Sequence, residues 1–286
     1  MTIDLRHLSE WIGRSQTVTD CITPFESNAL AATLDRKDPL YSDQTPLPPL
    51  WHWLHFLPIH KLEDAGYDGH AALGEFLPPV PLPRRMWAGS RLSWMAPMRI
   101  GRTLRKVSTI ASVDYKQGRS GDLVFVTVRH QVFDGDVQGI EEEHDIVYRA
   151  PADASAPASV PHQAPDSSAF SRVISPGPVL LFRYSALTFN GHRIHYDLPF
   201  CTGTEGYPGL VVHGPLLATL MLDLVRRAMP QAHVTTFDFR ALSPVFDTHD
   251  FSVHGQPDNN GSVKLWIRRH DGALAMTATA TLEVSK

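Results

Sequence analysis

The hydrophobic positions in the last third of the chain follow first the period of a helix and then that of strands. Between Pro215 and Pro230, apolar residues recur every three or four positions: Leu216, Leu217, Leu220, Met221 and Leu224. This spacing predicts a buried helix that begins near Pro215 and ends before Pro230. Apolar and polar residues then alternate, which predicts strands over 234–239, 263–268 and 274–282. A short apolar run predicts one further strand, over 179–183.

The first half of the chain repeats this arrangement more weakly. Residues 17–22 form a candidate strand, and a helix is predicted over 24–34 because Pro24 suits a first turn and Thr23 a helix cap. An aromatic stretch predicts a second helix over 49–57. Later strands are predicted over 102–115, 122–134 and 141–149. The pattern therefore favours an α+β protein built from two similar units.

The composition changes between these units. Residues 151–175 are rich in alanine, proline and serine, which bury too little apolar surface to fold and are typical of an exposed linker. We therefore expect an N-terminal domain over 1–150, a linker over 151–175 and a C-terminal domain over 176–286.

Charge and cysteine content narrow the class of protein. Of the 286 residues, 43% are apolar, and the net charge of -4 offers no basic surplus for a nucleic-acid partner. The two cysteines are far apart, so we expect a reducing compartment, the cytoplasm. The chain opens without a signal-like segment, and its most apolar window, 209–222, is too short to span a bilayer. We therefore expect no membrane partner.

Two polar runs flank the start of the predicted buried helix. Residues 188–197 read Thr-Phe-Asn-Gly-His-Arg-Ile-His-Tyr-Asp, and residues 207–215 read Tyr-Pro-Gly-Leu-Val-Val-His-Gly-Pro. His195 has the residue type of a general base, because the ordinary pKa of histidine is ~6.5. Asn190 can orient a water molecule. The free N–H groups of a helix start, here at Gly214, can stabilise an anionic oxygen.

These runs resemble the signature of R-specific enoyl-CoA hydratases and MaoC-like dehydratases. Aligned on the final histidine, the family's histidine corresponds to His195 and its aspartate to Asn190. Gly214 corresponds to the glycine whose N–H points at the thioester carbonyl. The family's Asn-Pro pair is His192-Arg193 here. These changes, and the run over 82–90, resemble the branch of 3-hydroxyacyl-thioester dehydratases and mesaconyl-C4-CoA and itaconyl-CoA hydratases.

The resemblance implies a double hot dog, in which each domain is an antiparallel sheet wrapped round a long central helix. It places catalysis in the C-terminal domain and makes the N-terminal domain a degenerate wall of the acyl pocket. The implied reaction is reversible hydration of an α,β-unsaturated acyl-CoA, with coenzyme A as part of the substrate and no other cofactor. Exposed sheet edges favour a homodimer.

A short branched dicarboxylyl-CoA, of the itaconyl or mesaconyl-C4 type, is the expected substrate. Its second carboxylate needs a cation, for which Arg84 and Arg85 are candidates, with Trp87 as pocket wall. Further candidate substrate contacts are Arg183, Arg193, Tyr196, Asp197 and His213. Asp197 is also an alternative partner of His195. The histidine clusters match no zinc signature, so no metal ion is expected.

Three alternatives remain open. A fatty-acid-type 3-hydroxyacyl-thioester dehydratase would need a long apolar pocket. A non-catalytic acyl-CoA-binding module would lose no activity on replacement of His195. A hot-dog thioesterase would need a carboxylate beside the thioester carbonyl, for which Asp197 is the candidate.

Overall fold

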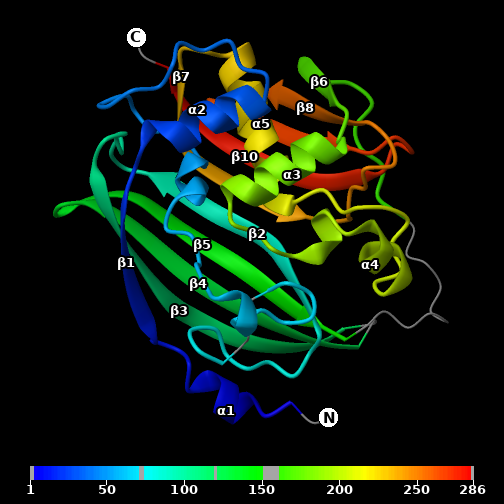
Figure 1. Ribbon diagram of the computed structural model, residues 1–286. Helices are drawn as coiled ribbons and strands as arrows, with labels where there is room; N and C mark the ends of the chain where they lie inside the picture. Colours follow the sequence, from blue (N-terminus) through cyan, green and yellow to red (C-terminus); the bar gives the residue numbers. More distant parts are fainter. Residues whose placement is uncertain (1–2, 71–73, 119–120, 151–160, 285–286) are drawn as a thin grey trace.

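A single antiparallel sheet organises the molecule (Figure 1). The computed structural model describes residues 3–70, 74–118, 121–150 and 161–284. Ten strands follow the order β1-β3-β4-β5-β2-β7-β10-β9-β8-β6. The first-half strands are β1 (Ser15–Cys21), β2 (Arg84–Trp94), β3 (Thr103–Gly118), β4 (Gly121–Asp134) and β5 (Val137–Arg149). The second-half strands are β6 (Phe170–Ile174), β7 (Ala232–Ala241), β8 (Phe251–Pro257), β9 (Ser262–Arg268) and β10 (Leu274–Val284).

The two halves of the sheet share one internal order. The first half has the order β1-β3-β4-β5-β2, and the second half has the equivalent order β6-β8-β9-β10-β7. The last strands of these two series, β2 and β7, pair with each other at the centre of the sheet. There Leu92 lies opposite Phe237, and both are buried. Each half also places helical segments between its first and second strands, and one further short helix of the first half precedes β1. The expectation of an α+β protein with two similar halves is confirmed.

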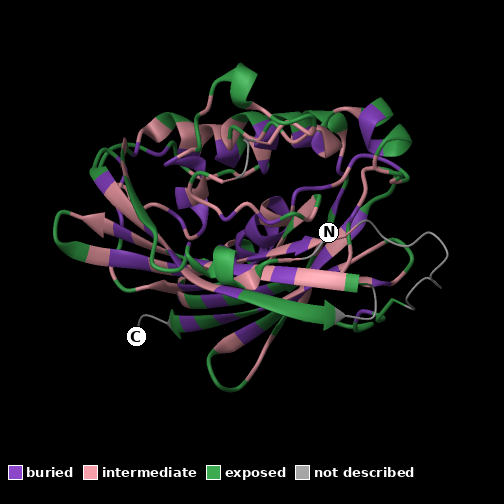
Figure 2. Ribbon diagram, turned by 90° about the horizontal axis from the view of Figure 1, so that it is seen from below, coloured by how far each residue is buried: buried purple, intermediate pink, exposed green. Residues whose placement is uncertain are grey.

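The helical segments gather on one side of the sheet, and buried residues lie between the two layers (Figure 2). In the first half they are α1 (Leu5–Ser9), α2 (Pro24–Thr33) and the 3₁₀ turns η1 (Trp51–Leu54) and η2 (Leu62–Asp64). In the second half they are α3 (Pro178–Leu187), η3 (Arg193–His195), α4 (Leu198–Gly203) and α5 (Gly214–Ala228). No helix in the described ranges combines the length and the apolar character needed to cross a membrane.

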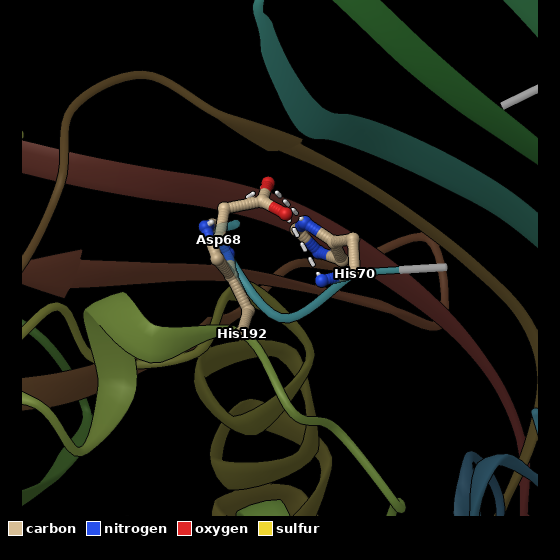
Figure 3. A group of neighbouring side chains, drawn as sticks. All are labelled: Asp68, His70 and His192. Atoms are coloured by element: carbon tan, nitrogen blue, oxygen red, sulfur yellow. Dashed lines mark hydrogen bonds and ion pairs between the residues drawn. The ribbon is translucent and has the colours of Figure 1, made fainter. Parts of the chain in front are cut away.

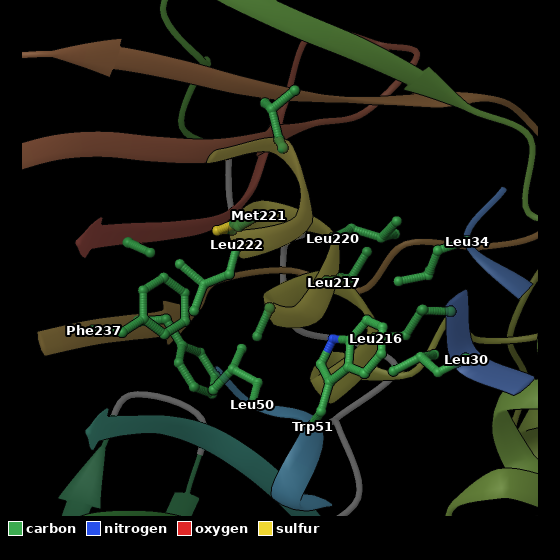
Figure 4. Close-up of a cluster of buried hydrophobic side chains, with 14 of the residues drawn as sticks. Leu30, Leu34, Leu50, Trp51, Leu216, Leu217, Leu220, Met221, Leu222 and Phe237 are labelled. Atoms are coloured by element: carbon green, nitrogen blue, oxygen red, sulfur yellow. The ribbon is translucent and has the colours of Figure 1, made fainter. Parts of the chain in front are cut away.

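Helix α5 is the long buried helix that the spacing predicts. Every residue from Leu216 to Val225 is buried, because the second-half strands pack on one side of α5 and first-half residues on the other. Figure 4 shows Leu30, Leu50 and Trp51 around the apolar side chains of α5. Burial of one such leucine contributes about 1.5–3 kcal/mol, so α5 joins the two halves through a common core.

The long central helix expected in each half is present only in the second. In the described first half the longest helix is α2, with ten residues. The predicted helix over 49–57 is wrong except for the single turn η1, because Leu50 (φ 70°) and Phe56 (φ 55°) adopt left-handed backbone conformations that an α-helix cannot contain.

Two further expectations are corrected. Residues 179–183 form part of α3 instead of a strand, since Pro178 starts a helix that buries Leu181 and Tyr184 and exposes Val179. The predicted linker over 151–175 contains β6, which pairs with β8, so its last residues belong to the sheet. Residues 151–160 lie outside the described ranges. The domain limits themselves stay a prediction.

Candidate active site

His195 is held in one tautomer just before the start of α5. It ends the turn η3, its side chain is 7% exposed, and its Nδ1 lies 2.7 Å from the carbonyl oxygen of Val211. A carbonyl only accepts, so Nδ1 carries the hydrogen and Nε2 carries the lone pair. Nε2 has no hydrogen-bond partner among the residues that the structure describes. The sequence candidate for the base therefore has its basic nitrogen available.

His213 packs directly on His195. The two rings are stacked, with 3.7 Å between centroids and 16° between planes. His213 precedes α5, is fully buried, and shares a 2.7 Å hydrogen bond with Ser185 of α3. Burial lowers the pKa of His195 to about 3, against the opposing effect of the Val211 carbonyl. The imidazole is therefore neutral at neutral pH and able to accept a proton.

The N-terminus of α5 adjoins this histidine pair. Gly214 is its first residue, Pro215 follows, and the cap residue His213 makes no side-chain hydrogen bond to the first turn. A Cβ built on Gly214 would meet no atom within 4 Å, so packing does not require glycine there. The helix start combines free N–H groups with about half a positive charge. The arrangement can stabilise an anionic oxygen close to His195.

Asn190 lies in the loop between α3 and η3. Its Oδ1 accepts the backbone N–H of His192 at 3.0 Å and so closes the turn that leads to His195. The described residues show no hydrogen bond between Asn190 and His195. The water-orienting role of Asn190 stays a prediction.

The residues after His195 are occupied in structural contacts. Arg193 forms an ion pair with Asp197 (2.8 Å), lies over the Phe200 ring and donates to the Tyr67 carbonyl (3.0 Å). Asp197 also caps α4 by accepting the N–H of Phe200. Its carboxylate is therefore engaged by Arg193 and Phe200, and the alternative that Asp197 partners His195 stays a prediction. Tyr196 is half exposed and donates to a carbonyl of its own turn.

The two adjacent arginines at the start of β2 have different surroundings. Arg84 pairs with Glu205 of the second half at 3.6 Å. Arg85 has no carboxylate within ion-pair distance in the described ranges, and it is close enough to His70, His192 and His144 to oppose their protonation.

Tyr148 lies opposite Arg85 in the β2–β5 register. Its hydroxyl is buried without a hydrogen-bond partner among the described residues. Arg85 opposes the rise that burial causes in the Tyr148 pKa, so the two side chains are neighbours. Arg85 thus has a neutral hydroxyl beside it and no carboxylate among the described residues. Trp87 packs on Trp53 and on His144, with ring centroids 4.9 and 4.0 Å apart, while Arg183 is exposed on α3.

The structure adds two residues that the sequence reasoning missed, Asp68 and His70 (Figure 3). They lie on a first-half loop, and their side-chain ligand atoms lie within 4.8 Å of each other and of His192. Burial opposes ionisation of Asp68, but the His70 hydrogen bonds outweigh it and hold the pKa of Asp68 well below its usual range. Burial lowers the pKa of His192 to about 3. No spacing in the sequence links this loop to residues 188–197; only the fold does.

Comparison with known proteins identifies the family of this chain. Residues 50–247 match the family model of hydroxyacyl-thioester dehydratase type 2. The chain is 45% identical to the mesaconyl-C(4)-CoA hydratase of Chloroflexus aurantiacus over 273 residues, which cover 95% of this chain and 96% of that protein.

Two solved structures are similar in fold. A MaoC-like dehydratase from Phytophthora capsici superposes with a TM-score of 0.67 at 12% identity, over 99% of this chain and 98% of that one. A Mycobacterium tuberculosis protein described as having a double hotdog fold gives 0.58 at 14% identity, over 95% and 96%. The double hot dog is thus confirmed, and the chain belongs to the hydroxyacyl-thioester dehydratase type 2 family.

Proposed function

We propose that this protein is a hydro-lyase that reversibly hydrates an α,β-unsaturated dicarboxylyl-CoA of the mesaconyl-C4 type. The observation that carries the proposal is the position of a neutral His195, with a free Nε2, against the N-terminus of α5. The Chloroflexus aurantiacus relative, similar over nearly the whole chain, supports the choice of substrate. Coenzyme A belongs to the substrate, and no separate cofactor is part of the proposal.

The proposed reaction needs one base and one oxyanion site. Nε2 of His195 takes a proton from water as the water oxygen bonds to the β-carbon. The double-bond electrons move to the thioester oxygen, which the N–H groups at Gly214 stabilise as an enolate. The imidazolium then returns its proton to the α-carbon, and the enolate collapses to the hydroxyacyl thioester. Dehydration follows the same steps in reverse.

The second carboxylate of the substrate is assigned to Arg85. A guanidinium that no described carboxylate pairs with can bind the substrate carboxylate through two hydrogen bonds, and the neutral Tyr148 opposite it in the β2–β5 register leaves its charge uncompensated. A fatty-acid-type dehydratase would instead need an apolar pocket end, where an unpaired arginine is costly. The Arg85 environment therefore favours the dicarboxylyl substrate over the fatty-acid alternative.

The test uses mesaconyl-C4-CoA, crotonyl-CoA and 2-octenoyl-CoA, with loss of conjugated-thioester absorbance and release of free thiol as parallel readouts. His195→Ala should lower kcat by about 10²–10⁴-fold, whereas His233→Ala, an exposed control, should match the wild type. Arg85→Met should raise KM for mesaconyl-C4-CoA at least tenfold and leave crotonyl-CoA unchanged.

Arg84→Met is the matched control for Arg85→Met, because Arg84 is paired with Glu205. Turnover of the straight-chain substrates alone would overturn the substrate assignment. Thiol release would indicate a thioesterase. Absence of all turnover in folded wild-type protein would indicate a binding module.

A further inference from the structure

The active-site segment of the second half lacks a carboxylate that can serve His195. Asn190 stands at the position where related sequences are expected to carry aspartate, and Asp197 is paired with Arg193. We propose that the first half supplies the missing carboxylate: Asp68 is a positioning residue that acts across His192 and stabilises the positive charge on His195 during turnover. This inference rests on the proposed function.

The loop that carries Asp68 is docked on the active-site turn by backbone contacts. The backbone N–H of Arg193 donates to the Asp68 carbonyl at 2.9 Å, and the Arg193 guanidinium donates to the Tyr67 carbonyl. A Cβ on Gly69, whose φ is +88°, would lie 2.0 Å from the carbonyl oxygen of Gly191. Only glycine permits this approach. The position of Asp68 is therefore fixed by the main chain and does not depend on its own carboxylate.

The Asp68 carboxylate faces two imidazoles. Its Oδ1 accepts the His70 N–H at 3.0 Å, while Oδ2 lies 2.9 Å from Nδ1 of His70 and 3.9 Å from Nε2 of His192. The His192 ring lies 5.5 Å from the His195 ring, measured between centroids, and edge-on to it. Arg85 opposes protonation of both His70 and His192, as does His60 for His70 and His213 for His192. A chain of side chains thus runs from Asp68 through His192 to His195.

This chain answers a chemical requirement of the reaction. When His195 takes the water proton, a positive charge appears in an enclosed place where burial disfavours it. A fixed negative charge nearby lowers the cost of that charge, and no bond to Asp68 forms or breaks. The proton remains on His195 until it passes to the α-carbon. Asp68 therefore acts through the histidines, and its effect should appear in kcat more than in KM.

The experiment compares Asp68→Asn, Asp68→Glu and the control Asp64→Asn, an exposed carboxylate of the same loop region. Asparagine still accepts the His70 N–H, so the loop and the melting temperature should be preserved. With mesaconyl-C4-CoA as substrate, we expect Asp68→Asn to lower kcat at least 30-fold and to leave KM within threefold of the wild-type value. Asp68→Glu should retain at least a tenth of the wild-type kcat. Asp64→Asn should match the wild type in both constants.

Several results would overturn the inference. One is a kcat of Asp68→Asn within threefold of the wild-type kcat. Another is a lower melting temperature of Asp68→Asn with kcat unchanged. A third concerns a metal ion: if chelation abolishes wild-type activity and Zn²⁺ restores it, Asp68, His70 and His192 are metal ligands instead. Failure of the proposed function is distinguishable, because wild-type protein would then show no hydration at all.

Discussion

Mild acid should destabilise this protein strongly, because several buried and half-buried histidines are held in the neutral form. Burial lowers the pKa of His130, His192 and His195 to about 3 and that of His144 to about 4. The unfolded chain binds protons at these residues near the ordinary pKa of ~6.5, whereas the folded chain does not. Stability is therefore fully present above pH 6.5 and is lost as the pH falls toward 4.

The size of the effect follows from proton linkage. Each such histidine changes the free energy of unfolding by about 1.36 kcal/mol per pH unit inside this window. Between pH 7 and pH 5.5 one histidine removes about 1.2 kcal/mol, and the four together remove about 5 kcal/mol. Domains typically have only 5–15 kcal/mol of stability. Glu142, whose pKa is well below its usual range, adds to the loss only at lower pH, since its unfolded-state pKa is already near 4.5.

Urea unfolding at pH 7.0, 6.5, 6.0 and 5.5, followed by tryptophan fluorescence, measures this loss. His144→Gln should remove about 1.2 kcal/mol of the loss between pH 7 and pH 5.5, because its ring packs on Trp87 without a hydrogen bond among the described residues. His233→Gln, on the exposed side of β7, should leave the dependence unchanged. A free energy of unfolding at pH 5.5 within 1 kcal/mol of the value at pH 7 would refute the reasoning.

Two further predictions concern α5. Gly214→Ala should fold with an unchanged melting temperature, because the added Cβ meets open space. Its kcat/KM for hydration should fall at least tenfold, because the methyl group obstructs the thioester oxygen. Activity equal to that of the wild type would exclude Gly214 from the oxyanion site. Asp223→Ala should lower the free energy of unfolding by about 3–5 kcal/mol, measured in urea, because the buried carboxylate pairs with Arg36, Arg172 and Arg227.

Where side-chain pattern alone decides an element, the sequence predicts it well. The three- and four-residue spacing after Pro215 identifies α5 within a residue or two, and alternation identifies β7, β9 and β10. The run over 179–183 fails because five apolar residues fit a buried strand and a helix face equally. Strand β6 is missed because its neighbours are small and polar, and its pairing with β8 depends on residues far along the chain.

The same distinction applies to the active site. His195 and Gly214 lie close in sequence to the start of α5. The motif predicts that they are neighbours, and the structure places His195 on His213, the residue before Gly214. Arg84 and Arg85 look equivalent in the sequence, and only the surroundings of β2 separate a paired guanidinium from an unpaired one. Asp68 could not be predicted, since Tyr67 and Arg193, which dock its loop, are 126 residues apart.

The two halves have diverged in complementary ways. The second half keeps the long helix, and its inner sheet face is apolar around it. The described first half has no helix of that length, and its sheet face holds a buried carboxylate beside η1: Glu142 accepts hydrogen bonds from Ser90 (2.9 Å) and Trp53 (3.0 Å) and lies 3.3 Å from His52. A face packed on an apolar helix could not carry such a group, because each buried charge needs partners. Without a long apolar helix, the first half can present polar groups to the active-site turn, Arg85 and Asp68 near His192 among them, and the proposed reaction uses both halves.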